Sequence, residues 1–210
     1  MTDLTLYHIS PSRSSIVLWM LEEIGEPYEV KLLDMKSGEN RQPAYLAVNP
    51  MGKVPAIRHN GVVITEAAAI CCYLADRFPA AALNVPIEDA ERGPYLKWLF
   101  FGPSCIEPAM IDQMAKREGM RISALGWGDL DSVVSVLRAA LARGPYLLGE
   151  RFTAADVVIG SGLRWGMMFK GIPPQPEFLD YTERLAERPA LKRAEARDAA
   201  FQKEAARPGG

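Results

Sequence analysis

The sequence offers no sign of a nucleic-acid partner, a membrane anchor or a disulfide framework. Its formal net charge of −2 is too small to attract nucleic acid or an anionic membrane surface. No apolar run has the length needed to span a bilayer, and the N-terminal segment lacks the basic-then-apolar pattern of a secretion signal. Three cysteines, Cys71, Cys72 and Cys105, do not suggest a disulfide scaffold. We therefore expect a cytoplasmic protein without nucleic-acid or membrane partners.

Signals for a metal ion or a nucleotide are missing as well. The two histidines, His8 and His59, have no acidic residue at a useful spacing. We interpret both as structural or surface residues and predict no metal site. No glycine-rich phosphate loop, internal repeat or low-complexity tract is present. The 49% of hydrophobic residues is ordinary for a globular chain, and 210 residues suffice for one large domain or two small ones.

The N-terminal part of the chain alternates between strand and helix signals. Residues 4–7 predict a short strand, a helix follows over about 13–24, and Gly25 is a good helix stop. Residues 28–33 alternate as a second strand should. A strand, a helix and a strand in this order predict a parallel pair with a right-handed crossover.

Residues 48–74 form the stretch around which the rest of the chain is organised. Pro55 lies near the start of a predicted strand, where a missing N–H costs the ladder least. Asn60-Gly61 favours a hairpin, because Asn-Gly tolerates positive φ. We expect Thr65 to cap a helix whose first turn holds Glu66, where the helix dipole favours a carboxylate. Together with the preceding unit, this predicts a thioredoxin-like α/β domain over residues 1–79.

Beyond this domain, alternation gives way to helical patterns. Prolines mark a predicted linker over residues 80–86. Residues 87–118 predict one long helix that prolines interrupt. Thr153 and Asp156 have a spacing close to that of a capping box, and the nearly apolar helix that they open should be buried. We assign residues 87–210 to an all-α domain, with further helices predicted over 130–141, 179–188 and 191–206.

Two of these motifs resemble the cytosolic glutathione S-transferase family. Val54-Pro55, followed by a strand pair and Glu66, resembles the family's glutathione-binding segment. The stretch FTAADVVIG over residues 152–160 resembles the folding box of its helical domain. The resemblance runs through both domains in the right order, and it points to the bacterial-type members and the serine- or cysteine-type classes. It implies a thioredoxin-like domain followed by an all-helical domain.

The resemblance also implies a glutathione site. The main chain of Val54, next to Pro55, would bind the cysteinyl part of the tripeptide, as an added strand does. Lys53 would lie near the glycyl carboxylate, and Glu66 would hold the γ-glutamyl end. Ala67 departs from the serine or threonine usual in the family, so one side-chain hydrogen bond is missing. The Ala67 N–H, near a helix N-terminus, can still serve an anion.

Ser12 is the candidate for contact with the glutathione thiol. In the serine- and cysteine-type classes, the active residue lies five positions after the tyrosine that ends the first strand, and counting from Tyr7 gives Ser12. Ser14 and Ser15 remain alternatives, and helix capping is a further explanation for serines at these positions. A cysteine at position 12 would have suggested thiol–disulfide chemistry, and its absence argues against that class.

The reaction and the partners follow from the same resemblance. We expect a homodimeric enzyme that adds the glutathione thiolate to a small hydrophobic electrophile. A non-catalytic glutathione-binding or protein-interaction module remains open, as does a glutathione-dependent isomerase or dehalogenase. We expect the electrophile pocket between the domains, and its candidate apolar side chains are Phe101, Cys105, Met110, Trp165 and Phe169.

Overall fold

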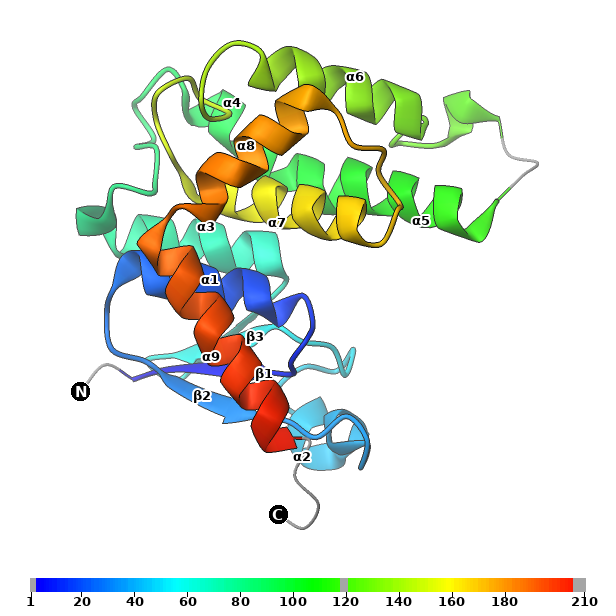
Figure 1. Cartoon of the computed structure of the whole chain (residues 1–210). Helices are drawn as coiled ribbons and strands as arrows, with labels where there is room; N and C mark the ends of the chain where they lie inside the picture. The colour runs from blue at the N-terminus through cyan, green and yellow to red at the C-terminus, as the bar shows by residue number, and fades with distance from the viewer. Residues whose placement is uncertain (1–2, 118–120, 206–210) are drawn as a thin grey trace. The chain divides into compact units, whose positions relative to one another are not determined.

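A computed structural model describes residues 3–117 and 121–205 (Figure 1). The chain divides into two compact units, residues 1–81 with 188–210 and residues 82–187. The first unit is α/β and the second is helical, as the sequence predicts. The predicted linker over residues 80–86 spans the boundary between them. The last helix, however, belongs to the first unit, whereas the sequence pattern placed it in the helical domain.

The sheet of the first unit has the strand order β2-β1-β3-β4. β1 (Leu4–His8) pairs in parallel with β2 (Glu29–Leu32), which confirms the predicted parallel pair. β3 (Ala56–His59) runs antiparallel to β1 and to β4 (Val62–Thr65). The turn between β3 and β4 has positive φ at both Asn60 and Gly61, as the Asn-Gly signal predicts.

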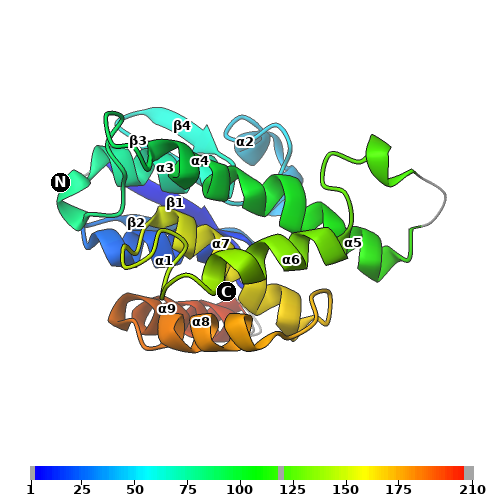
Figure 2. The same cartoon turned by 90° about the horizontal axis from the view of Figure 1, so that it is seen from above.

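Four helices complete this unit, and three of them lie in one row. α1 (Ser14–Ile24) lies between α3 (Ala67–Arg77) and α9 (Pro189–Ala205), as Figure 2 shows. The short α2 (Pro43–Leu46) precedes β3 in the chain. One prediction is corrected: Thr65 is the last residue of β4, so Glu66 and not Thr65 caps α3. Short 3-10 turns cover Glu39–Arg41 and Pro79–Ala81.

Successive side chains of β1 point to opposite faces of the sheet, and both faces are packed. Leu4, Leu6 and His8 share one face of the strand and are almost fully buried. Tyr7 lies on the opposite face, where its ring centroid is 5.7 Å from that of Tyr45. His8 is therefore a polar side chain inside an otherwise apolar layer.

Helix α9 groups with the first unit, and arginines on α9 and immediately before it pair with acids of α1. Arg188 binds Glu23 through two hydrogen bonds of 2.6 and 2.8 Å. Arg193 and Arg197 each donate to Glu22 at 2.9 Å. Bidentate and clustered pairs of this kind fix geometry as well as add attraction. Sequence spacing gives no hint of these pairs, since the partners lie more than 160 positions apart.

The second unit consists of helices. The helix predicted over residues 87–118 begins later, at Arg92, and consists of two α-helices joined by a π-helical segment, Gly102–Ile106, which contains Pro103. Residue 118 lies outside the described part. None of the helices in the described residues has the length and hydrophobicity needed to cross a bilayer. The helices are α4 (Arg92–Phe101), α5 (Glu107–Ala115), α6 (Leu130–Leu141), α7 (Ala154–Met168) and α8 (Pro176–Ala186), with a 3-10 turn at Ile122–Ala124.

Helix α7 is the buried centre of this unit, and it begins with the predicted capping box. Asp156 accepts hydrogen bonds from the main-chain N–H groups of Thr153 at 2.8 Å and Leu147 at 2.9 Å, and from the Tyr181 hydroxyl at 3.0 Å. Burial raises the pKa of Asp156, although these hydrogen bonds act in the opposite direction. Asp156 thus connects the start of α7 both to the loop at Leu147 and to Tyr181 of α8.

Candidate active site

Three candidate segments converge at one edge of the sheet. The loop that holds Ser12 leaves the C-terminal end of β1. Because β3 is antiparallel to β1, Ala56 at the start of β3 pairs with Tyr7 near the end of β1, so Val54 and Pro55 enter the sheet at the end where the serine loop leaves it. Ala56 also pairs with Thr65, the last residue of β4, so Glu66 follows β4 at the same end of the sheet. The serine loop and the segment from Val54 to Glu66 therefore meet at one end of the sheet.

The serine-rich loop is held by a dense set of hydrogen bonds. The hydroxyl oxygens of Ser12 and Ser14 are 2.6 Å apart, and the Ser14 N–H donates to Ser12 Oγ at 3.1 Å. Ser14 is fully buried, and Ser15 donates its hydroxyl to Asp198 at 2.7 Å. Ser12 is only half-buried. Ser15 is also half-buried, but its hydroxyl is donated to Asp198, so Ser12 remains the candidate among the three serines, and Arg13 beside it is exposed.

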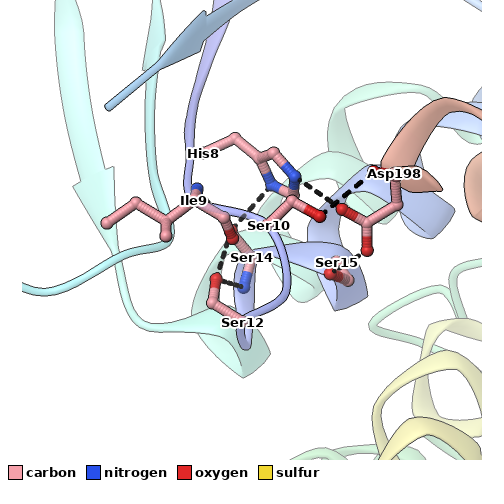
Figure 3. Close-up of polar contacts among 7 residues, drawn as sticks. All are labelled: His8, Ile9, Ser10, Ser12, Ser14, Ser15 and Asp198. Atoms are coloured by element: carbon pink, nitrogen blue, oxygen red, sulfur yellow. Dashed lines mark hydrogen bonds and ion pairs between the residues drawn. The ribbon is translucent and has the colours of Figure 1, made fainter. Parts of the chain in front are cut away.

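His8 and Asp198 are polar residues of this site that the sequence pattern missed (Figure 3). Ser14 Oγ lies 2.7 Å from His8 Nδ1, and His8 Nε2 lies 2.9 Å from Asp198 Oδ1. The expectation that His8 has no acidic partner is therefore wrong, because Asp198 reaches it from α9. Burial alone would raise the pKa of Asp198, but hydrogen bonds from His8 and Ser15 hold it below its usual value. The pair lies 190 positions apart, so no spacing rule predicts it.

The segment before β3 is fixed through its main chain. The Lys53 carbonyl accepts hydrogen bonds from the Tyr45 hydroxyl and the Asn49 side-chain amide, both at 2.7 Å. Gly52 has φ +61°, and a Cβ there would lie 2.8 Å from the Asn40 main-chain oxygen. Only glycine fits this position without a shift. The Lys53 side chain is exposed, Val54 is half-buried outside the ladder, and the Val54–Pro55 peptide bond is cis.

Glu66 adopts a backbone conformation that a non-glycine residue rarely takes. Its φ is 69° and its ψ 116°, and its side chain is exposed. Its carbonyl accepts the Ile70 N–H at 2.9 Å as the first bond of α3. Residues in such regions cost about 1–3 kcal/mol and cluster at functional sites. Ala67 follows as the first residue of α3. Its N–H thus lies in the first turn, where a helix N-terminus favours negative charge.

The five predicted electrophile contacts all lie on the second unit. Phe101 ends α4, and its ring centroid is 5.5 Å from that of Trp98. Trp165 and Phe169 form an edge-to-face pair, with centroids 5.9 Å apart, at the C-terminal end of α7. Cys105 lies in the π-helical segment and Met110 in α5. A hollow of about 420 Å³ in this unit is lined by other residues, namely Arg164, Met167, Met168, Leu179, Thr182 and Glu183.

A second hollow, of about 240 Å³, lies in the first unit beside Tyr7 and Tyr45. Burial is the largest cause that raises the pKa of Tyr45, to about 12. None of the predicted glutathione contacts lines this hollow.

Within the described residues, no group of three or more His, Cys, Asp or Glu side chains could hold a metal ion. His59 is buried, and its Nδ1 is hydrogen-bonded to the Tyr73 hydroxyl at 2.8 Å. Cys71 is also buried, and burial raises the pKa of its thiol.

Comparison with known proteins identifies the family. The chain matches the models for the N-terminal domain of glutathione S-transferase over residues 2–76 and the C-terminal domain over residues 128–189. It is 34% identical to glutathione S-transferase 3 of Schizosaccharomyces pombe, across 73% of this chain and 70% of that protein. A glutathione transferase of Methylococcus capsulatus has a similar structure, with a TM-score of 0.78 and 30% identity over 94% of this chain and 99% of the other. A Sulfitobacter homologue solved with bound glutathione gives a TM-score of 0.76 and 26% identity, again over 94% and 99%. This chain therefore belongs to the glutathione S-transferase family.

Proposed function

We propose that this protein binds glutathione and adds its thiolate to small hydrophobic electrophiles. The observation that carries the proposal is that the loop of Ser12, the entry to β3 at Val54 and the exit of β4 at Glu66 all lie next to the paired residues Tyr7, Ala56 and Thr65, at one end of the sheet. The serine loop and the Val54–Glu66 segment belong to different motifs, and a shared ligand would explain why they meet. A homologue at 26% identity was solved with glutathione bound, which supports the choice of ligand.

Each candidate residue has a distinct role in this proposal. The Val54 main chain, next to Pro55 and outside the β3 ladder, pairs with the cysteinyl part of glutathione as an added strand would. Lys53 attracts the glycyl carboxylate. Glu66 accepts a hydrogen bond from the γ-glutamyl end, and the Ala67 N–H faces the carboxylate there. Phe101, Cys105, Met110, Trp165 and Phe169 are the proposed contacts of the electrophile.

Thiol activation is the chemical task, and Ser12 is proposed to perform it. A free thiol has a pKa of about 8.5, so only a few per cent is thiolate at pH 7. A hydrogen bond from the Ser12 hydroxyl to sulfur stabilises the thiolate more than the neutral thiol. Lowering the thiol pKa by one unit corresponds to about 1.4 kcal/mol. This is within reach of one hydrogen bond to a charged group.

The test is a glutathione titration of the purified protein, followed by turnover measurements. We expect calorimetry to detect glutathione binding and chlorodinitrobenzene, a small apolar aryl halide, to be conjugated. Ser12→Ala should slow conjugation by roughly 5- to 150-fold near neutral pH, with a much smaller change in glutathione affinity. Absence of binding would overturn the proposal.

A non-catalytic glutathione-binding protein is the second candidate, and Ala67 is the observation that favours it. An alanine at the start of α3 removes the hydroxyl that the family usually offers to glutathione. Binding without turnover on an alkyl halide, an aryl halide and an unsaturated carbonyl would select this candidate.

We also propose that the protein acts as a cytoplasmic homodimer. Along α3, Ala69 is exposed, and Cys72 and Tyr73 are half-buried. A helix side of small and apolar residues of this kind suits a symmetric contact with a second copy.

A further inference from the structure

Four side chains of the first unit form one continuous chain of hydrogen bonds (Figure 3). Ser12 Oγ lies 2.6 Å from Ser14 Oγ, which lies 2.7 Å from His8 Nδ1. His8 Nε2 lies 2.9 Å from Asp198 Oδ1. Ser14 and His8 are fully buried, and the Asp198 side chain is 15% exposed. The half-buried hydroxyl of Ser12 is thus connected to a carboxylate that lies behind two buried side chains.

The donor and acceptor capacities of these groups set the direction of every hydrogen. An ionised Asp198 only accepts, so His8 Nε2 must carry a hydrogen. In a neutral imidazole Nδ1 is then an acceptor, and the Ser14 hydroxyl donates to it at 2.7 Å rather than to the Ile9 carbonyl, which is farther away at 3.2 Å. Ser14 Oγ also accepts the Ile9 N–H at 3.2 Å, and its remaining lone pair accepts the Ser12 hydroxyl.

In this arrangement Ser12 has no hydrogen to offer a ligand. Its hydroxyl hydrogen points to Ser14 Oγ, and its oxygen accepts the Ser14 N–H at 3.1 Å. Within the described residues, one lone pair of Ser12 Oγ is left, and it can accept the S–H of a bound thiol. A thiolate, by contrast, needs a donor at the same place.

We propose that Ser12, Ser14 and His8 form a proton relay that takes up the thiol proton of glutathione, with Asp198 as the counter-ion. The S–H bond breaks as its proton passes to Ser12 Oγ. The Ser12 proton moves to Ser14 Oγ, and the Ser14 proton moves to His8 Nδ1. The products are a thiolate and an imidazolium ion paired with Asp198, so protons and charge balance. This inference rests on the proposed role of Ser12.

The relay leaves every group satisfied after the transfer. The His8 Nδ1–H now donates to Ser14, the Ser14 hydroxyl donates to Ser12, and the Ser12 hydroxyl points at the thiolate. One proton shift therefore both removes the thiol proton and creates the hydrogen bond that stabilises the thiolate. His8, Ser14 and Asp198 are positioning residues, because only Ser12 would touch glutathione.

His8 is enclosed by Asp198 and by the ring of Phe201. Asp198 is the charged group that faces the ring directly, and Ser15 Oγ holds its second oxygen at 2.7 Å. The ring of Phe201 covers His8 with its centroid at 5.5 Å. Arg197, next to Asp198 in the chain, lies 5.9 Å from the centroid of the Phe201 ring and pairs with Glu22. A buried ion pair of His8 and Asp198 is thus shielded from solvent. Ser14 itself cannot act as a nucleophile on an acyl substrate, because it is fully buried.

The pKa of bound glutathione, followed by the ultraviolet absorbance of the thiolate, tests the relay. We expect Asp198→Asn, Ser14→Ala and His8→Asn each to raise that pKa by about one unit or more. The kcat/KM for chlorodinitrobenzene should then fall about tenfold or more at neutral pH and recover at a pH above the raised thiol pKa. Glutathione affinity should change less than about threefold, since the contacts with the peptide are untouched.

Matched variants separate the relay from a general loss of structure. His59→Asn removes another buried histidine, Asp112→Asn another partly buried paired aspartate, and Ser161→Ala another buried serine. These three should leave the thiol pKa unchanged. In the native protein, nitrogen-15 NMR should show His8 neutral without glutathione and protonated with it. This last measurement needs no variant to fold.

The outcomes distinguish the relay from the proposed function. If Ser12→Ala raises the thiol pKa but Asp198→Asn and Ser14→Ala do not, Ser12 acts alone and the relay is wrong. If His8 stays neutral while the thiolate forms, the relay is also wrong. If the protein binds no glutathione, or Ser12→Ala leaves the thiol pKa unchanged, the proposed role of Ser12 fails first and the relay fails with it.

Discussion

At the scale of single residues, Glu66 combines an uncommon backbone with a proposed binding role. Its φ of 69° is costly for a side chain with a Cβ, yet a carboxylate occupies the position. Glycine would adopt this backbone more easily, but it offers no acceptor. We therefore interpret Glu66 as a residue that lowers the stability of the fold slightly and offers a carboxylate to a ligand.

Glu66→Gln should weaken glutathione binding by roughly tenfold or more. The substitution keeps the size and backbone of the residue but removes the charge that strengthens its hydrogen bond, and a bond to a charged group contributes about 1.5–3 kcal/mol. Isothermal calorimetry measures the change directly. Glu26→Gln, at another exposed position of the first unit, is the control and should bind normally. Equal affinities in both variants would remove Glu66 from the site.

Individual site residues were predictable only where neighbours in sequence determine them. The serine loop was found by its distance from Tyr7, yet its register was left open among Ser12, Ser14 and Ser15. The three serines differ in their surroundings, because Ser14 is buried and Ser15 donates its hydroxyl to Asp198. Both differences depend on tertiary packing. The pairing of His8 with Asp198 was missed for the same reason, because it exists only when α9 docks.

At the scale of elements, the sequence predicted best the structures that local chemistry determines. The Asn60-Gly61 turn and the capping box of Thr153 and Asp156 were both predicted and found. The start of α3 was predicted one residue early, since continued pairing of β4 holds Thr65 in the sheet. The sequence pattern placed α9 in the helical domain, whereas its contacts with α1, charged pairs among them, group it with the first unit.

The contact of α9 with α1 should weaken in acid through Glu22. Burial raises its pKa, but hydrogen bonds from Tyr28, Arg193 and Arg197 outweigh burial and lower it overall. A carboxyl with a lowered folded-state pKa adds stability above its unfolded pKa and loses that contribution as pH falls through the folded-state value.

Denaturant unfolding of the native protein and Glu22→Gln across pH measures this contribution. The variant should be less stable at neutral pH, and the difference should disappear once the pH has fallen below the lowered folded-state pKa of Glu22, where this carboxyl is protonated in both the folded and the unfolded protein. Glu26→Gln serves again as the control and should show no such trend. A difference that is independent of pH would mean that Glu22 acts through packing alone.

At the scale of the whole molecule, the outward side of α3 leads to a prediction about assembly. We expect a mass of twice the chain by light scattering at micromolar concentration. Ala69→Glu places a charge on the exposed side of α3 and should shift the population towards monomer, because burying an unpaired charge is costly. Ala139→Glu, on the exposed side of α6, adds the same charge elsewhere and should leave the mass unchanged. A light-scattering mass equal to that of one chain for the native protein would contradict the proposed dimer.

The return of α9 to the first unit also has a consequence for how the molecule is made. Its α/β unit is discontinuous, with residues 82–187 inserted between α3 and α9. A ribosome that makes the chain from its N-terminus releases the sheet, Ser12 and His8 early, but Asp198 only after the whole helical unit has been translated. Until then His8 lacks its partner Asp198, and Glu22 and Glu23 of α1 lack their arginine partners. Domains generally fold as units and in order of synthesis, yet this one becomes complete only after its neighbour has emerged.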